Sequence, residues 1–294
     1  MYILFLVLFP LLVSCGSSPS APKPENFYTG RSGFALMAEG AELYITADVN
    51  SSRTILDNLV LGGLKGAEIK RFLDMSDVLT AAVFYSTKRH FYAAAIGKFP
   101  SAGGGLFFST SKDWEKKLSA SGLPYWYSEQ SRLSISLNSR AAYLSDTDPF
   151  VPPPGTRVPE ALPALQNGAV LCGWMNNPSE AFNRIIADFG VPIEIPADRL
   201  LFAVYPKDTK TEQYTATLRF ETPTPTQATA LARIFSMARL GLAMADFTGR
   251  ENMKALAEAL FFQNPKADGS ALILNTGPMK GSNLALLFNA ISIY

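Results

Sequence analysis

Paired runs of alternating apolar residues recur along this chain and limit it to folds that contain antiparallel sheet. In residues 213–220 every second residue from Tyr214 to Phe220 is apolar, and Thr215, Thr217 and Arg219 lie between them. A period of two places the apolar side chains on one face of a β-strand. We therefore predict hairpins, each with a polar turn, for the paired runs 77–85 with 90–99, 124–128 with 132–138, and 198–205 with 213–220.

Helical patterns lie between these hairpins. Apolar residues recur three or four positions apart in 53–64, 106–120, 179–189, 226–244, 250–261 and 283–291. Single strands are expected at 41–49 and 169–175. In the segment 106–120 the expected apolar members of the helix are Phe107, Trp114 and Leu118.

The same order of elements, strand, helix, hairpin, helix and strand, occurs twice. Residues 145–164 lie between the two copies and contain six prolines, which is typical of a linker. We predict an α+β fold of two related halves, 27–144 and 165–294, each an antiparallel sheet with helices packed on one face. An internal duplication would explain the repeated order, and chance similarity between hairpins would explain it as well.

The N-terminal residues predict a signal segment. Residues 3–14 are apolar except for one proline and one serine, and this run is shorter than the roughly 20 residues of a spanning helix. It ends in Leu12-Val13-Ser14-Cys15, which resembles the lipobox of bacterial lipoproteins. The resemblance implies removal of the signal peptide 1–14 and attachment of acyl chains such as palmitate to Cys15. The alternatives are an ordinary cleaved signal and a buried N-terminal element.

The residues after the lipobox predict a tether. Residues 15–26 are polar, with three prolines and no apolar periodicity, so we expect a flexible segment that follows the lipidated Cys15. In the lipoprotein family the residue after the cysteine influences sorting. By this resemblance, Gly16 in place of an aspartate favours the outer membrane over the inner membrane, if the organism has an outer membrane. The predicted location is the cell envelope, on a membrane, through the lipid anchor.

Composition narrows the expected partners. The formal net charge is +1, so no basic field attracts nucleic acid. Charged residues make up 17% of the chain, below the roughly 25% of ordinary soluble domains, and there are 20 phenylalanines. Such a body has a large core, or it exposes apolar surface to an unknown protein or an apolar ligand.

No pattern of catalytic or metal-binding residues is evident. The single histidine, His90, follows a polar turn, and no spacing of His or Cys residues matches a metal site or a bound cofactor. Ser109 and Lys112 match the short SxxK pattern of serine–lysine acyl transferases, but the companion motifs are missing. Cys172, in an apolar run, is expected to be a buried small hydrophobe.

The most unusual cluster is aromatic: Tyr125, Trp126 and Tyr127. In a strand Tyr125 and Tyr127 would face one side and Trp126 the other. At least one ring is then expected in the core, while the other side is a candidate binding surface, because Tyr and Trp are common at interfaces.

These observations predict a non-enzymatic lipoprotein that presents a binding or scaffolding body from the membrane. The first alternative is a carrier of an apolar ligand such as a lipid. The second is a hydrolase in which His90 or Lys112 meets a carboxylate or a serine in a cleft. No known family is recognised in the chain beyond the lipobox.

Overall fold

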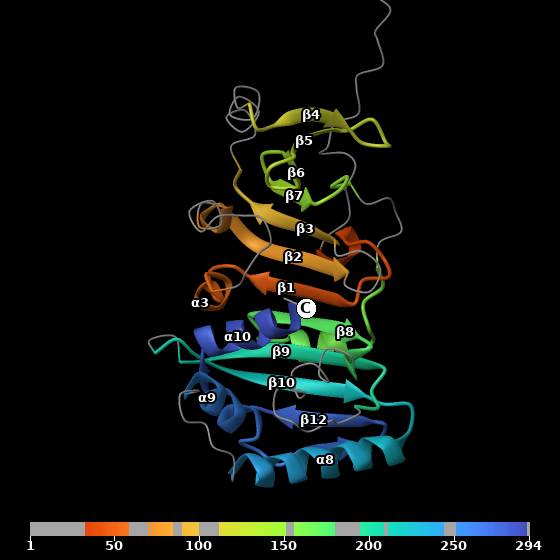
Figure 1. The fold of residues 1–294 in the computed structure, drawn as a ribbon, viewed down its shortest axis with the longest axis vertical. Helices are drawn as coiled ribbons and strands as arrows, with labels where there is room; N and C mark the ends of the chain where they lie inside the picture. Colours follow the sequence, from red (N-terminus) through yellow and green to blue (C-terminus); the bar gives the residue numbers. More distant parts are fainter. Residues whose placement is uncertain are drawn as a thin grey trace, which may run out of the picture.

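One continuous antiparallel sheet runs through both halves of the chain (Figure 1). This computed structural model describes residues 33–58, 70, 72–84, 90–99, 112–150, 156–179, 195–208, 211–243 and 251–292. In these ranges the sheet has 13 strands. They are β1 (Leu43–Asp48), β2 (Ser76–Phe84), β3 (His90–Gly97), β4 (Glu115–Leu118), β5 (Pro124–Ser128), β6 (Leu133–Leu137), β7 (Ala141–Ser145), β8 (Leu171–Asn176), β9 (Arg199–Asp208), β10 (Gln213–Glu221), β11 (Lys266–Asp268), β12 (Ala271–Asn275) and β13 (Met279–Lys280).

The strand order is β11-β12-β10-β9-β8-β1-β2-β3-β7-β6-β5-β4, and β13 pairs with β10 off this path. The predicted hairpins are confirmed as β2–β3, β5–β6 and β9–β10. The two halves meet where β1 pairs antiparallel with β8, with Ile45 opposite Gly173. Each half therefore contributes strands to a shared sheet, where the sequence predicted two sheets.

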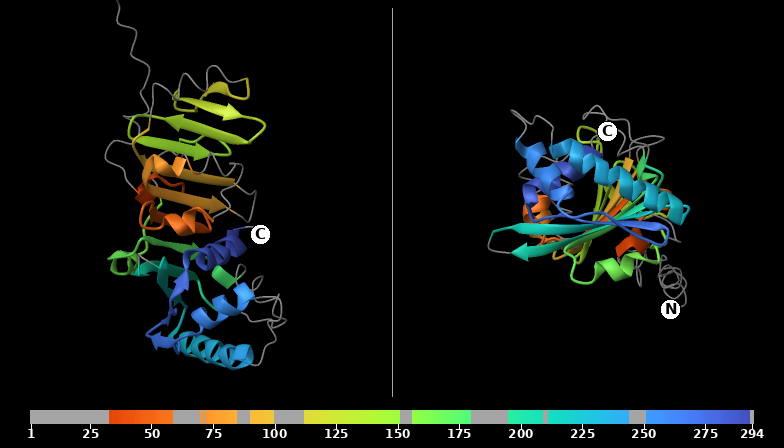
Figure 2. Two further views of the ribbon diagram at one scale, coloured as in Figure 1. Left: turned by 90° about the vertical axis from the view of Figure 1, so that its left-hand side faces the viewer. Right: turned by 90° about the horizontal axis from the view of Figure 1, so that it is seen from below.

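Helices cover both faces of this sheet. They are the 3-10 helix η1 (Gly33–Leu36) and the α-helices α3 (Arg53–Leu56), α6 (Leu162–Gln166), α8 (Pro225–Ala243), α9 (Glu251–Leu260) and α10 (Gly281–Ser292). Figure 2 shows the sheet edge-on, with α8, α9 and α10 on one side and α6 on the other. The prediction that helices pack on one face is therefore wrong for η1 and α6.

The alternation of each strand divides the core into two apolar clusters. On β10 the apolar residues from Tyr214 to Phe220 belong to the cluster under α3, α8, α9 and α10, together with Ile55, Leu231 and Phe288. The cluster on the opposite face contains Phe34 of η1, Leu162 of α6, and Tyr44 and Trp174 of the central strands. Because both faces of the central strands are buried, they carry apolar residues at nearly every position.

The helix predicted at 106–120 is wrong over residues 115–118, which form strand β4. The sequence Glu-Lys-Lys-Leu has good helix formers, but pairing with β5 overrides this local preference. In the predicted linker 145–164, the side chains of Phe150 and Leu162 are buried, at 5% and 0% exposure. The described part of this segment is thus packed against the sheet at two points.

Candidate functional site

The aromatic cluster lies on β5, the second strand from one end of the sheet (Figure 1). Trp126 is opposite Ile135 of β6 and packs against the apolar cluster that lies under α3, α8, α9 and α10. Tyr125 packs against the cluster on the other face. Both side chains are only partly buried, so each ring closes one edge of a core layer and leaves part of its surface to solvent.

Tyr127 differs from its neighbours because it belongs to neither cluster. The Nζ of Lys117 lies 4.2 Å from the centroid of its ring. A contact of this kind contributes about 0.5–1 kcal/mol at an exposed site. A hydrogen bond with Glu129, and to a lesser extent partial burial, raises the pKa of the Tyr127 hydroxyl.

The neighbouring strand β4 ends the sheet and is largely exposed. Its residue Leu118 is 68% exposed, which is unusual for a large apolar side chain in a strand. Glu115 lies opposite Tyr127, and its Oε2 is 3.4 Å from the Nζ of Lys117. Lysines, a tyrosine and an exposed leucine thus share this end of the sheet.

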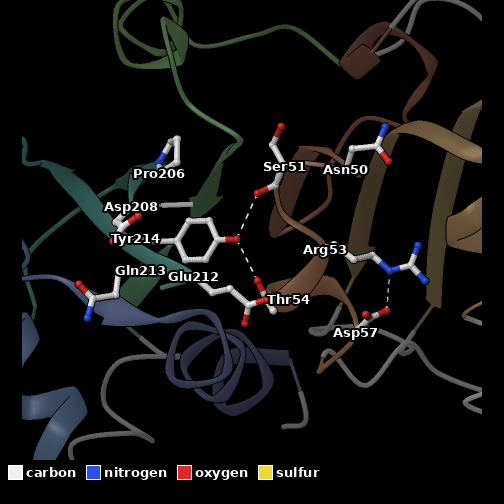
Figure 3. Close-up of a pocket in the computed structure, with 10 residues that line it drawn as sticks. All are labelled: Asn50, Ser51, Arg53, Thr54, Asp57, Pro206, Asp208, Glu212, Gln213 and Tyr214. Atoms are coloured by element: carbon white, nitrogen blue, oxygen red, sulfur yellow. Dashed lines mark hydrogen bonds and ion pairs between the residues drawn. The ribbon is translucent and has the colours of Figure 1, made fainter. Parts of the chain in front are cut away.

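A polar pocket of about 280 Å³ lies at a second place, between the turn that begins α3 and the β9–β10 hairpin (Figure 3). Its floor is the hydroxyl of Tyr214, which lies 2.9 Å from Thr54 Oγ1 and donates a hydrogen bond to the carbonyl oxygen of Ser51 at 3.2 Å. These bonds tie the first half of the chain to the second. The lining residues are Asn50, Ser51, Arg53, Thr54, Asp57, Pro206, Asp208, Glu212, Gln213 and Tyr214.

The charges of the pocket are partly satisfied within the protein. Arg53 forms ion pairs of 2.8 Å with Asp57 through Nε and with Asp74 through Nη1. Asp208 accepts a hydrogen bond of 2.8 Å from Thr211 Oγ1. The pocket therefore offers hydroxyl, amide and carboxylate groups to a polar ligand. The sequence contains no local pattern that joins these residues, so they were not predicted as a site.

The candidates for hydrolase chemistry occupy other places. His90 stacks on Phe84 with ring centroids 4.0 Å apart and is partly exposed at the start of β3. Lys112 is exposed, and Ser109 lies outside the described residues. Neither His90 nor Lys112 lines the polar pocket.

Cys172 is buried on β8, as predicted, at 2% exposure. Burial raises the pKa of its thiol to about 11. The thiol is therefore neutral at physiological pH, and only a thiolate is a good nucleophile or metal ligand. Cys15 and residues 15–26 of the predicted tether lie outside the described residues.

Two kinds of feature are absent from the described ranges. No group of three or more His, Cys, Asp or Glu side chains there is arranged to hold a metal ion. In the same ranges, no helix is both long enough and apolar enough to cross a membrane.

The fold resembles solved structures of one protein. Crystal form I of TP0453 matches with a TM-score of 0.58 and 15% sequence identity, over 88% of this chain and 97% of that chain. Crystal form III gives the same TM-score and identity over 89% and 99%. At this level of identity the likeness concerns the fold alone.

Sequence comparison relates the first part of the chain to a described family. Residues 31–144 match the family described as outer membrane-associated lipoprotein TP0453. The outer membrane protein TP0453 of Treponema pallidum (strain Nichols) is 25% identical over 100 residues. That alignment spans 34% of each protein, about a third of the relative's length.

These matches are to an outer membrane-associated lipoprotein, which is the class and the location that the lipobox predicts. They also correct one expectation, because the chain beyond the lipobox does resemble a known family over residues 31–144. Acylation of Cys15 itself stays a prediction.

Proposed function

We propose that this chain is a non-enzymatic lipoprotein that presents a protein-binding body from the outer membrane, with the β4–β5 end of the sheet as its binding surface. The observation that carries the proposal is that both faces of this end carry accessible side chains: the partly exposed ring of Tyr127 under Lys117 on one face, and the exposed Leu118 on the other. Interfaces favour such aromatic side chains because they bury a large area at a low cost in conformational entropy.

The alternatives gain no support from the polar pocket. A carrier of an apolar ligand needs an apolar cavity, whereas this pocket is lined by hydroxyl, amide and charged groups. A hydrolase needs a nucleophile with a nearby base, and neither His90 nor Lys112 is among its lining residues. Both alternatives therefore rest on the sequence alone.

Photo-crosslinking tests the binding surface. A photoreactive amino acid replaces Tyr127 in the full-length chain, which is illuminated in its native envelope. The expected result is a protein adduct that is not formed when the same amino acid replaces Phe262, which is 58% exposed and lies after α9. Identical adducts from the two positions, or none from Tyr127, would contradict the proposal.

The lipid anchor has its own test. Intact mass of the protein extracted with detergent should correspond to a chain that begins at Cys15 and carries acyl groups. In a Cys15→Ala variant this mass should disappear and the protein should leave the membrane fraction. Retention of the variant in the membrane would show that another element holds the protein there.

The proposed duplication gains support from the strand order. From the β1–β8 pair outwards, β1, β2, β3 and β7 follow one another in one direction, and β8, β9, β10 and β12 in the other. In each half the second and third of these strands form a hairpin. We infer that the two halves are copies of one ancestral unit.

A further inference from the structure

β4 is one terminal strand of the sheet (Figure 1). It pairs antiparallel with β5, from Glu115 opposite Tyr127 to Leu118 opposite Pro124. Among the residues that the structure describes, no second strand pairs with it. Half of the backbone N–H and C=O groups of an edge strand point away from its partner, and an added strand can bind them.

The side chains of β4 alternate between the two faces of the sheet. Glu115 and Lys117 share the face of Tyr127, and Lys116 and Leu118 share the face of Trp126. Glu115, Lys116 and Leu118 are exposed. A strand added to this edge would thus find two adjacent lysines, one on each face, followed by an exposed leucine.

We propose that β4 binds an extended segment of a partner protein that carries two consecutive acidic residues directly preceded by an apolar one. The segment adds to the sheet as a further antiparallel strand. Its acidic residues lie opposite Lys116 and Lys117, and its apolar residue lies opposite Leu118. Opposite charges on facing strands stabilise such a pairing, and like charges destabilise it. This inference rests on the proposed function, because it specifies the partner of the same surface.

Charge also distinguishes this partner from a second copy of the chain. If two β4 strands paired antiparallel over all four residues, Lys116 of one copy would face Lys117 of the other, twice. Lysines on an edge strand normally prevent indiscriminate pairing of this kind. The same two lysines therefore disfavour pairing with most strands and favour pairing with an acidic strand.

The test uses the full-length chain in detergent and a fluorescent peptide, Thr-Thr-Val-Glu-Glu-Lys-Thr-Thr. This peptide places valine opposite Leu118 and the two glutamates opposite the lysines in antiparallel register. Fluorescence anisotropy should show saturable binding. The charge-reversed peptide Thr-Thr-Val-Lys-Lys-Glu-Thr-Thr should bind about fivefold more weakly or worse.

Two further measurements separate strand addition from simple charge attraction. The backbone amides of the peptide are methylated at the odd positions in one frame and at the even positions in the other. One frame should abolish binding and the other should preserve it, because an added strand directs every second N–H group to its partner. The double variant Lys116→Glu, Lys117→Glu should lose binding. Lys207→Glu, Lys266→Glu, which changes two exposed lysines outside β4, should keep it.

Equal effects of the two methylation frames, equal binding of the two peptides, or full binding by the Lys116→Glu, Lys117→Glu variant would overturn the inference. These outcomes are distinct from failure of the proposed function. A specific crosslink from position 127 together with failed peptide binding would retain the binding surface and reject strand addition. Absence of both would reject the two together.

Discussion

The ring of Trp174 stacks on the ring of Tyr44, with centroids 4.4 Å apart and ring planes inclined by 22°. The two residues are directly opposite in the β1–β8 pairing, so this stack joins the two halves of the chain. Phe34 meets the same tryptophan edge-on at 4.6 Å. The hydroxyl of Tyr44 donates a hydrogen bond to the carbonyl oxygen of Ala38 and accepts one from the amide of Ala41.

Replacement of Trp174 by alanine should therefore weaken the junction between the halves. Trp174 is 2% exposed, and removal of a buried aromatic side chain lowers the free energy of unfolding by about 3–5 kcal/mol. Urea unfolding followed by circular dichroism measures this loss. Trp126→Ala, at the partly exposed end of the sheet, is the matched control and should cost less. An equal or larger loss in the control would contradict the central role of Trp174.

Gly173 should not tolerate a side chain. A Cβ at this position would lie 2.0 Å from the carbonyl oxygen of Tyr44 and 2.8 Å from Cζ of Phe202. Because a backbone atom of the neighbouring strand would have to move, Gly173→Ala should destabilise the protein by about 1–3 kcal/mol or more. Cys172→Ala, at the next residue, is the control and removes atoms rather than adding them. Wild-type stability of Gly173→Ala in thermal unfolding would show that β1 and β8 separate easily.

Asn138 should stabilise the turn between β6 and β7 through its side-chain oxygen. Its Oδ1 accepts hydrogen bonds from the amides of Arg140 at 2.8 Å and Ala141 at 2.7 Å. Asn138→Ala leaves the buried amide of Ala141 and the part-buried amide of Arg140 without this acceptor and should cost about 1–3 kcal/mol of unfolding free energy. Asn138→Asp keeps the acceptor and should retain most of the stability in the same urea titration. Equal losses in both variants would indicate that side-chain packing rather than hydrogen bonding matters here.

Stability should fall at alkaline pH because of Cys172. Burial raises the pKa of its thiol to about 11 from an ordinary value of 9.0, so the unfolded chain releases this proton more readily than the folded one. The stabilisation is complete below about pH 8 and is lost as the pH rises from about 9 to 11, by roughly 2–3 kcal/mol.

Burial also raises the pKa of Tyr205, so Cys172 is not the only group whose folded and unfolded pKa values differ at alkaline pH. The measurement is therefore the difference in unfolding free energy between the wild type and Cys172→Ala at pH 8 and at pH 10.5. A difference that does not change with pH would contradict the predicted role of the thiol.

The sequence predicted the elements that depend on local pattern. Alternation in residues 213–220 defined β10, and the lipobox at Cys15 led to the class of protein. Two features without a local signal were missed. The pairing of β1 with β8 joins residues far apart in the chain, and β4 is a strand only because β5 lies beside it.

In the candidate site, too, the features with a local sequence pattern were predicted and the others were missed. The opposite orientation of Tyr125 and Trp126 followed from the period of a strand and agrees with their packing in different clusters. The position of Lys117 above Tyr127 depends on the register of β4 against β5, which no local pattern specifies. The polar pocket combines residues from both halves for the same reason.

The central position of the β1–β8 pair has a consequence for biosynthesis. β1 emerges early during synthesis and export, but one of its edges stays open until β8 has followed it across the membrane. An unpaired apolar strand is prone to aggregation. Export of this chain should therefore depend on periplasmic chaperones that hold β1 until its partner strand arrives.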